Sequence, residues 1–372
     1  PATSAMLNHP SGLWGGVLRE GDAFSLFVAD TENYRVRRID SRTGRIDTVA
    51  GVGVASEGGD RYDGNAATGV KLGRIGSISG DSAGNVYIFE GGRLHRIEVL
   101  KGVIRTIAGS GRLDGEFTGD GTAGMDVTMN IGSMWVSTEG LLFYGDLSSH
   151  LVRAIVLKEE AFPVKTFIGT GEIVRNGERN GAMQMNVNMI RGIVGDRSGN
   201  LYLSESGYVQ QDDDDSNDDD SVGGYSRLLR YRRDEGVVEE LSMMSGEESL
   251  SVCPEGLWYS GDEKTLYVVD ECFNKLYRMN EASRQSEVVV RGDSNSNQEK
   301  IPLERFVASK LQAVWGDEGS RSVFVADDSS RVYLINAEEK FALQIAGTGE
   351  AGYSGDNGQA LSARLSARSE ER

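Results

Sequence analysis

The sequence predicts an all-β protein, a six-bladed β-propeller of four-stranded antiparallel blades, and three observations lead to this fold class. A strand that ends in an acidic residue recurs six times along the 372 residues at nearly even spacing. Each interval holds four short runs that alternate apolar and polar residues or are rich in β-branched residues, too many strands for a helical repeat. A Gly-rich segment at 344–365, QIAGTGEAGYSGDNGQALSARL, returns in imperfect copies from Thr48, Thr106 and Thr166. Six such units with linkers between them are typical of a propeller.

The first unit shows the expected plan of one blade. Its four strands are expected, from the innermost outwards, near residues 11–15, 25–30, 34–40 and 45–50. After the outermost strand the chain must return across three strand spacings, roughly 14 Å at about 4.8 Å each, which requires an extended linker. The Gly-rich copies are expected to be these linkers. Small residues near their ends predict one helical turn before the next innermost strand, at 2–6, 123–125, 182–185 and 360–363.

The repeats predict one domain over residues 1–365, followed by a polar tail at 366–372. The expected blades cover approximately 1–53, 54–111, 112–171, 172–244, 245–292 and 293–349, with a further linker copy at 350–365. The chain starts with Pro inside a repeat linker, so we expect a piece of a longer protein. Blade 4 carries an insertion with seven Asp between Asp212 and Asp220. Because like charges repel and cannot bury apolar surface, this insertion is expected to be disordered.

Composition restricts the kinds of partner. Lys and Arg total 39 against 57 Asp and Glu, so the formal net charge is −18. Such a charge repels phosphate backbones and anionic lipids at long range, which makes nucleic acid an unlikely partner and a protein, of basic character, the expected one. No run of 18 apolar residues predicts a membrane span, so a soluble protein is expected. The sequence leaves the compartment and the oligomeric state open.

One unit reads LNHPSGLWG, then FVADTENYRVRRID, then GRIDTVAGVG, and this pattern resembles the NHL repeat. The linker GTGEAGYSGDNGQALSARL is similar to that of the long-linker branch of the family. The resemblance covers nearly the whole chain and is strongest in blades 1, 2, 3 and 6. It implies a six-bladed propeller that binds other molecules on one face, usually beside other domains. Some members of the family bind proteins, some bind RNA, and one relative is a zinc-dependent amidating lyase.

Acidic residues supply the candidate binding site. The acids that end the second strand of each blade share one level of the propeller, at Asp30, Glu90, Asp146, Glu205, Asp270 and Asp327. One interpretation is that each carboxylate accepts hydrogen bonds from the backbone of its own turn. The other is an acidic ring around the upper opening that attracts cations or a basic partner. The linker acids Asp63, Asp120 and Asp356 are expected on the same upper face. We therefore predict that binding depends on upper-face acids, including Asp120 and Asp356.

Catalytic chemistry finds little support, so we predict a non-catalytic binding or scaffold module without a cofactor. The three histidines, His9, His95 and His150, fall at unequal levels, whereas a three-His zinc site needs ligands that converge. The linker acids do not supply the regularly spaced oxygens of a calcium loop, and a divalent cation such as calcium remains an alternative. Two further alternatives stay open. One is a metal-dependent hydrolase or lactonase with an axial Asp/Glu/Asn site, and the other is an RNA-binding domain.

Tryptophan and cysteine give two predictions about packing. Four tryptophans recur in the innermost strands of blades 1, 3, 5 and 6 and are expected to pack between blades, at Trp14, Trp135, Trp258 and Trp315. Cys253 precedes the innermost strand of blade 5, and Cys272 follows its second strand. Neighbouring antiparallel strands can meet the Cα separation of about 4.4–6.8 Å that a disulfide requires. We predict this disulfide, with two reduced cysteines as the alternative; the location is left open, and a disulfide would favour a secreted or lumenal one.

Overall fold

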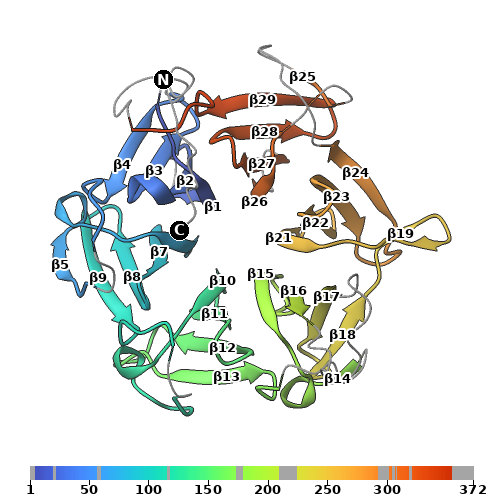
Figure 1. Cartoon of the computed structure of the whole chain (residues 1–372), viewed down its shortest axis with the longest axis horizontal. Coiled ribbons are helices and arrows are strands. Elements are labelled where there is room, and N and C mark those ends of the chain that lie inside the picture. Colours follow the sequence, from blue (N-terminus) through green and yellow to red (C-terminus); the bar gives the residue numbers. More distant parts are fainter. Residues whose placement is uncertain are drawn as a thin grey trace, which may run out of the picture.

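Six antiparallel sheets stand like blades around a central channel, which confirms the predicted fold class (Figure 1). The computed structural model describes residues 5–19, 22–56, 60–114, 118–172, 179–208, 224–291, 301–303, 306, 308–317 and 321–353. The Asp212–Asp220 insertion, Asp356 and the tail at 366–372 lie outside these residues. The described helices are single 3-10 turns of three residues, and none of them is long and apolar enough to cross a membrane.

Each blade holds four consecutive strands whose order from the channel outwards follows the sequence. The strands of blades 1 to 3 are β1 (Pro10–Val17), β2 (Phe24–Asp30), β3 (Arg35–Asp40), β4 (Ile46–Ala50); β6 (Ile75–Gly80), β7 (Asn85–Glu90), β8 (Arg93–Glu98), β9 (Val103–Ala108); and β10 (Ile131–Val136), β11 (Leu141–Asp146), β12 (Leu151–Val156), β13 (Val164–Ile168). Those of blades 4 to 6 are β15 (Met189–Gly195), β16 (Leu201–Tyr208), β17 (Gly224–Arg232), β18 (Val237–Leu241); β21 (Pro254–Ser260), β22 (Thr265–Asp270), β23 (Lys275–Asn280), β24 (Ser286–Arg291); and β26 (Leu311–Asp317), β27 (Ser322–Asp327), β28 (Val332–Asn336), β29 (Phe341–Ala346).

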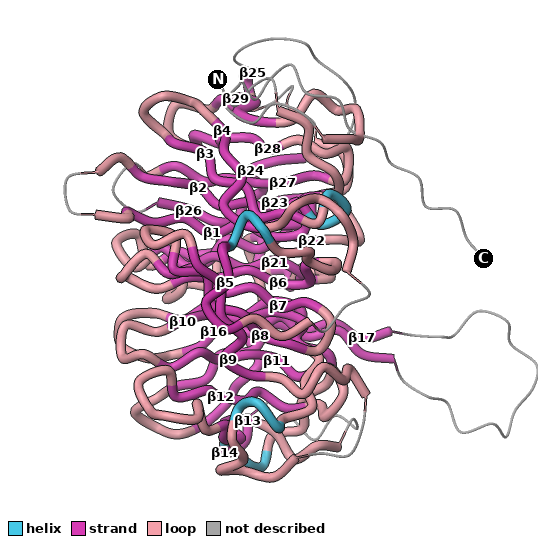
Figure 2. The backbone as a smooth tube through the Cα atoms, turned by 90° about the vertical axis from the view of Figure 1, so that its left-hand side faces the viewer, coloured by secondary structure: helices cyan, strands magenta, loops and turns pink. Residues whose placement is uncertain are grey.

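The upper face is the face on which the turns between the second and third strands and the linkers between blades emerge. Figure 2 shows it on the right, where β17 extends beyond the other labelled strands. Blade 4 has the longest central hairpin, because β16 and β17 pair as far as Tyr208 and Gly224.

Three of the linkers form an additional strand that the sequence does not predict. Each adds a fifth strand to the outer edge of a blade. These strands are β5 (Asp63–Ala66), β14 (Arg179–Gly181) and β25 (Ile301–Pro302), which pair with β9, β18 and β29. An outermost strand exposes a row of unpaired N–H and C=O groups, and pairing with the linker protects that edge. A small separate hairpin is formed by β19 (Met244–Ser245) and β20 (Glu248–Ser249).

Two of the predicted helical turns are present as 3-10 helices, η3 (Gly124–Asp126) and η4 (Ala182–Gln184). A third, η2 (Ala67–Gly69), occupies the corresponding place in the linker to blade 2, and η1 (Thr31–Asn33) forms the turn after β2. The turn predicted at 360–363 and the first residues of the one at 2–6 fall outside the described residues.

The Gly-rich signature that begins the linkers after β4, β9, β13 and β29 has a steric cause. Gly51 follows β4 with φ at +88°, and a Cβ there would lie 2.2 Å from the carbonyl oxygen of Tyr34. Gly347 repeats this after β29, with φ at +82° and the oxygen of Ser330 at 2.0 Å from the ideal Cβ. Only glycine fits where the chain turns so closely over the start of a neighbouring strand with positive φ.

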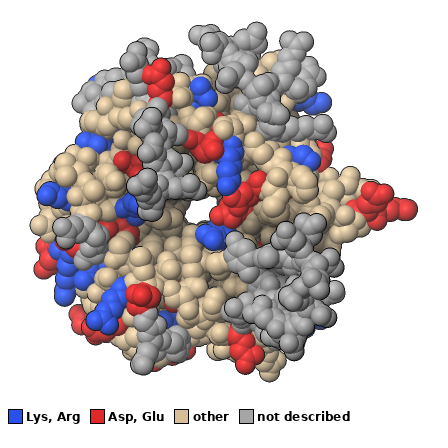
Figure 3. Space-filling view, in the orientation of Figure 1, with Lys and Arg blue, Asp and Glu red and all other residues tan. Residues whose placement is uncertain are grey.

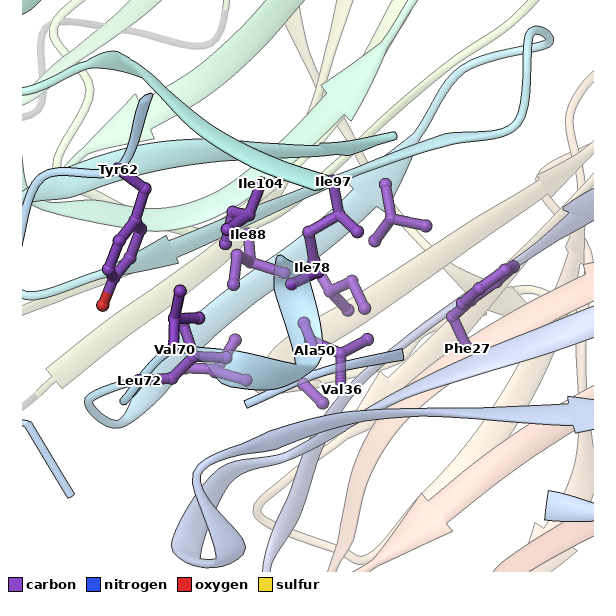
Figure 4. Close-up of a cluster of buried hydrophobic side chains, with 14 of the residues drawn as sticks. Phe27, Val36, Ala50, Tyr62, Val70, Leu72, Ile78, Ile88, Ile97 and Ile104 are labelled. Atoms are coloured by element: carbon purple, nitrogen blue, oxygen red, sulfur yellow. The ribbon is translucent and has the colours of Figure 1, made fainter. Parts of the chain in front are cut away.

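The apolar cores lie between adjacent blades. In Figure 4, Phe27, Val36 and Ala50 of blade 1 face isoleucines of blade 2, with linker residues closing the outer side. Isoleucine and valine dominate this cluster, as expected for side chains that pack on pleated surfaces. Burial of such side chains contributes about 1.5–3 kcal/mol each, which explains how four-stranded sheets that touch mainly through their faces hold together.

The four tryptophans lie in the innermost strands and pack between blades, each against a glycine in the innermost strand of the following blade. A Cβ added at Gly80, Gly195, Gly316 or Gly15 would lie within 2.7 Å of the indole of Trp14, Trp135, Trp258 or Trp315, respectively. Ser79 and Val194 take the tryptophan position in blades 2 and 4, and larger residues, Val136 and Tyr259, then take the glycine position. Large and small residues thus alternate around the channel, which fills the space between blades at normal density.

The two ends of the described chain meet where the ring closes. Ala5 and Leu7 are buried against residues of blade 6 in one apolar cluster. The linker that leaves blade 6 reaches the top of blade 1, where Asn33 donates a hydrogen bond from Nδ2 to the oxygen of Gly352 at 2.7 Å. The guanidinium of Arg35 lies 3.4 Å from the ring centre of Tyr353. Segments from both ends therefore join blades 1 and 6.

Candidate binding site at the upper opening of the channel

The structure brings the six strand-end acids to the predicted level of the propeller, but it buries them. Each has an exposed fraction of 3 % or less. Their carboxylates accept backbone N–H groups from the segment that leads into the innermost strand of the same blade: Asn8 to Asp30 at 2.5 Å, Gly73 to Glu90 at 3.2 Å, Asn130 to Asp146 at 3.4 Å, Cys253 to Asp270 at 3.2 Å and Ser309 to Asp327 at 3.2 Å. Each of these five acids therefore ties the start of its blade to its second strand.

Basic residues of the third strand accompany three of these acids. Arg37 Nη1 lies 3.3 Å from Asp30 Oδ2, His95 Nε2 lies 3.0 Å from Glu90 Oε1, and the Arg227 guanidinium makes the corresponding ion pair in blade 4 with Glu205 at 3.1 Å. His95 is thus occupied inside blade 2, where its Nδ1 also lies 3.1 Å from Thr106 Oγ1. A buried charge needs such a partner, because desolvation alone would be strongly unfavourable.

Burial also raises the pKa values of four of these acids. It raises the pKa of Asp30 to about 6, although the positive charge of Arg37 partly opposes the shift. The pKa of Asp327 is likewise raised to about 6 by burial, against hydrogen bonds from Arg331 N and Ser329 Oγ. The pKa values of Asp146 and Asp270 are raised for the same reason. These carboxylates make their contacts inside the blades, and none of the six lines the channel cavity. An axial metal site would need them to converge there.

Two of the linker acids contact residues of outermost strands. Asp63 belongs to β5 and pairs with Arg105 of β9 at 2.8 Å, halfway along the outer edge of blade 2. Asp120 Oδ1 accepts hydrogen bonds from N and Oγ1 of Thr166 in β13 at 2.7 and 2.8 Å. These two acids therefore lie beside outermost strands, because each linker first follows the outermost strand of a blade. Asp356 lies outside the described residues.

The upper opening is surrounded by other charged residues, of both signs (Figure 3). Two ion pairs join neighbouring blades here, Arg74 with Glu32 at 2.6 Å and Lys310 with Glu271. Glu32 and Glu271 belong to the turns directly after strand-end acids, and Arg74 and Lys310 directly precede innermost strands. Sequence reasoning missed them because it followed the repeated acid and ignored the varied residues beside it.

A cavity of about 340 Å³ occupies the channel between the six innermost strands. At its upper end each innermost strand has an irregularity in register near its second residue, which leaves one residue unpaired in five strands and two, Glu255 and Gly256, in β21. The residues at this place are Ser11, Gly76, Gly132, Arg191, Glu255 and Gln312. A bulge redirects the side chain of its extra residue, and here it brings polar groups to the cavity.

Blade 5 contributes a disulfide beside this opening. Cys253 and Cys272 are bonded with their Cα atoms 5.5 Å apart, at the place where the sequence predicts their pairing. The bond links the segment before β21 to the turn after β22, and that turn carries Glu271. The disulfide therefore restrains one part of the rim of the upper opening, the edge that carries Glu32, Arg74, Glu271 and Lys310.

Replacement of both cysteines by Ser is expected to lower the free energy of unfolding by about 2–3 kcal/mol, because the closed loop is short and the bond mainly restricts the unfolded chain. Urea denaturation of the double variant would measure this. The wild-type protein, denatured with and without a phosphine reductant, provides the control. Equal stability of the wild type in both conditions would contradict the prediction.

Comparisons with known proteins support the architecture. No family model and no curated protein sequence matches the chain. A chain in the crystal structure of a nidogen/laminin complex is similar, with 13 % identity, a TM-score of 0.52, and 85 % of this chain and 90 % of that chain covered. Virginiamycin B lyase from Staphylococcus aureus matches with 12 % identity, a TM-score of 0.48, and coverage of 91 % and 84 %. The extracellular domain of a putative hybrid two-component system from B. thetaiotaomicron has 10 % identity and a TM-score of 0.46, with 87 % of this chain and 32 % of that chain covered. At such identities likeness shows only the fold, which is that of a six-bladed β-propeller.

Proposed function

We propose that this propeller is a non-catalytic binding module whose upper face docks a protein partner. The observation that carries the proposal is the position of exposed apolar side chains. Among the described residues, four of the seven exposed large hydrophobic side chains belong to linkers or turns of the upper face, namely Val54, Leu113, Phe273 and Tyr353. These four residues belong to separate loops around the upper opening, and binding groups tend to lie on loops that a rigid scaffold holds in place.

The strand-end acids support this function indirectly. They anchor the segments that carry the rim residues, so their loss would disturb the face without removing any direct contact with a partner. The net charge of −18 favours a basic partner, whose association should be faster at low ionic strength. The disulfide fits an oxidising compartment, which is where we place the protein.

Serine substitutions on the two faces give a direct test. The upper variant combines Val54→Ser, Leu113→Ser and Phe273→Ser, whose side chains are 45 to 55 % exposed. The lower variant combines Val17→Ser and Leu100→Ser, which are similarly exposed, at 48 and 47 %, but lie at the end of β1 and between β8 and β9. Because all five are on the surface, both variants should unfold at nearly the same temperature as the wild type.

The binding readout compares which secreted proteins of the source organism the three immobilised forms retain. We expect a set of proteins that the wild type and the lower variant both retain. The upper variant should retain at least tenfold less of these proteins. Losses in the lower variant alone, or identical retention by all three forms, would place the working surface elsewhere.

A further inference from the structure

We infer that the upper end of the channel is a binding site for a small zwitterion of the α-amino-acid type, with Arg191 holding its carboxylate and Glu255 its ammonium group. This inference is independent of the proposed protein-binding role, since its ligand is a small molecule and its site is the cavity rather than the surrounding face.

Among the described residues that line the cavity, Arg191 and Glu255 are the only charged ones. They come from β15 and β21, the innermost strands of neighbouring blades, and occupy the bulge position in both. The opposite half of the opening carries small residues at the equivalent position, Ser11, Gly76 and Gly132. One side therefore offers two opposite charges and the other side offers space.

Neither charge is held in an ion pair within the described residues. Within the described part of the chain, neither residue has an oppositely charged group within 4.0 Å, although other charged residues of the rim are paired. The one hydrogen bond of the Arg191 side chain runs from Nη2 to the sulfur of Met189 at 3.9 Å, a weak acceptor. The Glu255 backbone is held in place, because Ser204 Oγ donates to its carbonyl oxygen at 2.6 Å. The two charges thus face the cavity from fixed backbones without closing on each other.

A zwitterion satisfies both groups at once. An arginine fork binds a carboxylate through two parallel hydrogen bonds, and a partly buried carboxylate binds an ammonium group. A ligand with one charge would leave the other group desolvated and unpaired, which is unfavourable. The cavity of about 340 Å³ lies near the lower end of the range for small-molecule sites, about 300–1,000 Å³. Its lining combines apolar side chains, among them the four tryptophans, with serine and glutamine side chains that can hydrogen-bond a small polar molecule.

The protonation of Glu255 makes binding depend on pH. Burial raises the pKa of Glu255 to about 6; Arg191 and Lys310 oppose this shift and Glu271 adds to it. As the pH falls through this value the carboxylate is lost, and the ammonium group loses its partner. The affinity for a zwitterion should therefore decrease between pH 7 and pH 5.

The test uses L-serine with its two half-analogues, 3-hydroxypropionate and ethanolamine, measured by isothermal titration calorimetry. L-Leucine serves as a second, larger zwitterion. We expect at least one of the two amino acids to bind. Each half-analogue should bind at least tenfold more weakly than L-serine. Arg191→Met should lower the affinity for the amino acid at least tenfold. Glu255→Gln should lower it to the same extent and should also remove its pH dependence.

Arg74→Met is the matched control, because this charge also directly precedes an innermost strand and pairs on the rim with Glu32, outside the cavity lining. It should leave the affinity within about twofold. The pH profile of the wild type keeps the test valid if a variant fails to fold. Absence of heat with both amino acids up to their solubility, or unchanged affinity in both cavity variants, would overturn the inference.

Discussion

Replacement of Arg37 by Met is expected to lower the free energy of unfolding by about 3–5 kcal/mol, because it leaves the Asp30 carboxylate buried without its ion-pair partner. Both side chains are fully buried, with Arg37 Nη1 3.3 Å from Asp30 Oδ2. Arg37 also donates a hydrogen bond to the carbonyl oxygen of Met6 at 3.1 Å, near the N-terminal end of the described chain. Urea denaturation at pH 7 would measure the change.

Arg38→Met provides the control on the same strand. Arg38 pairs with Asp47 at 3.1 Å, but both side chains are about one-third exposed, at 29 and 32 %. Water already screens such a pair, so its loss should lower the free energy of unfolding by about 1 kcal/mol or less. Similar losses in the two variants would show that burial does not govern the effect.

The pH dependence of the free energy of unfolding provides a second test of the Asp30–Arg37 ion pair. The folded pKa of Asp30, about 6, lies above the ordinary value of 3.8, so the folded state binds a proton more readily than the unfolded state. The stability associated with this group is therefore present below about pH 4 and is lost as the pH rises through about 6. Arg37→Met should enlarge this loss and extend it to higher pH, since the charge that opposes the rise in pKa is removed. Asp30→Asn in the same background should abolish the added loss and recover stability at pH 7.

The blades could be predicted from the sequence because strands and tight turns are encoded locally. The expected strand at 25–30 ends at Asp30 in the structure, and the outermost strand expected at 45–50 is β4, Ile46–Ala50. The level of Asp30 follows from its place at the end of a strand. The direction of its carboxylate does not, because it depends on the N–H of Asn8 and the guanidinium of Arg37, which approach from other segments.

The site at the channel opening was less accessible to sequence reasoning. Asp63 and Asp120 lie at outer edges because their linkers pair with outermost strands, a tertiary contact without a local pattern. Arg191 and Glu255 reach the cavity through bulges, and a bulge depends on pairing with a second strand. A usable signal existed near the start of each innermost strand, at its second residue or, in β15, its third: this position varies among Ser, Gly, Arg, Glu and Gln while the residues around it repeat.

Trp258→Ala is expected to lower the free energy of unfolding by about 3–5 kcal/mol, the usual range for loss of a buried aromatic side chain. Trp258 is 8 % exposed, and its ring centre lies 5.1 Å from that of Tyr267. Its indole also covers Gly316 in the innermost strand of the next blade. The substitution would therefore open a cavity between blades 5 and 6, and urea denaturation would measure the loss.

Gly316→Ala tests the same contact from the other side and should show strong coupling with Trp258→Ala. A Cβ on Gly316 would lie 2.5 Å from the indole, so the single substitution should lower the free energy of unfolding by about 1–3 kcal/mol through overpacking. In the Trp258→Ala background the added methyl group enters the vacated space, and its cost should vanish or change sign. Gly256→Ala in β21 is the control, since its Cβ would meet its nearest neighbour at 3.5 Å and should cost little in either background. Additive effects of Trp258→Ala and Gly316→Ala would refute the large-to-small packing scheme around the channel, because independent sites show no interaction free energy.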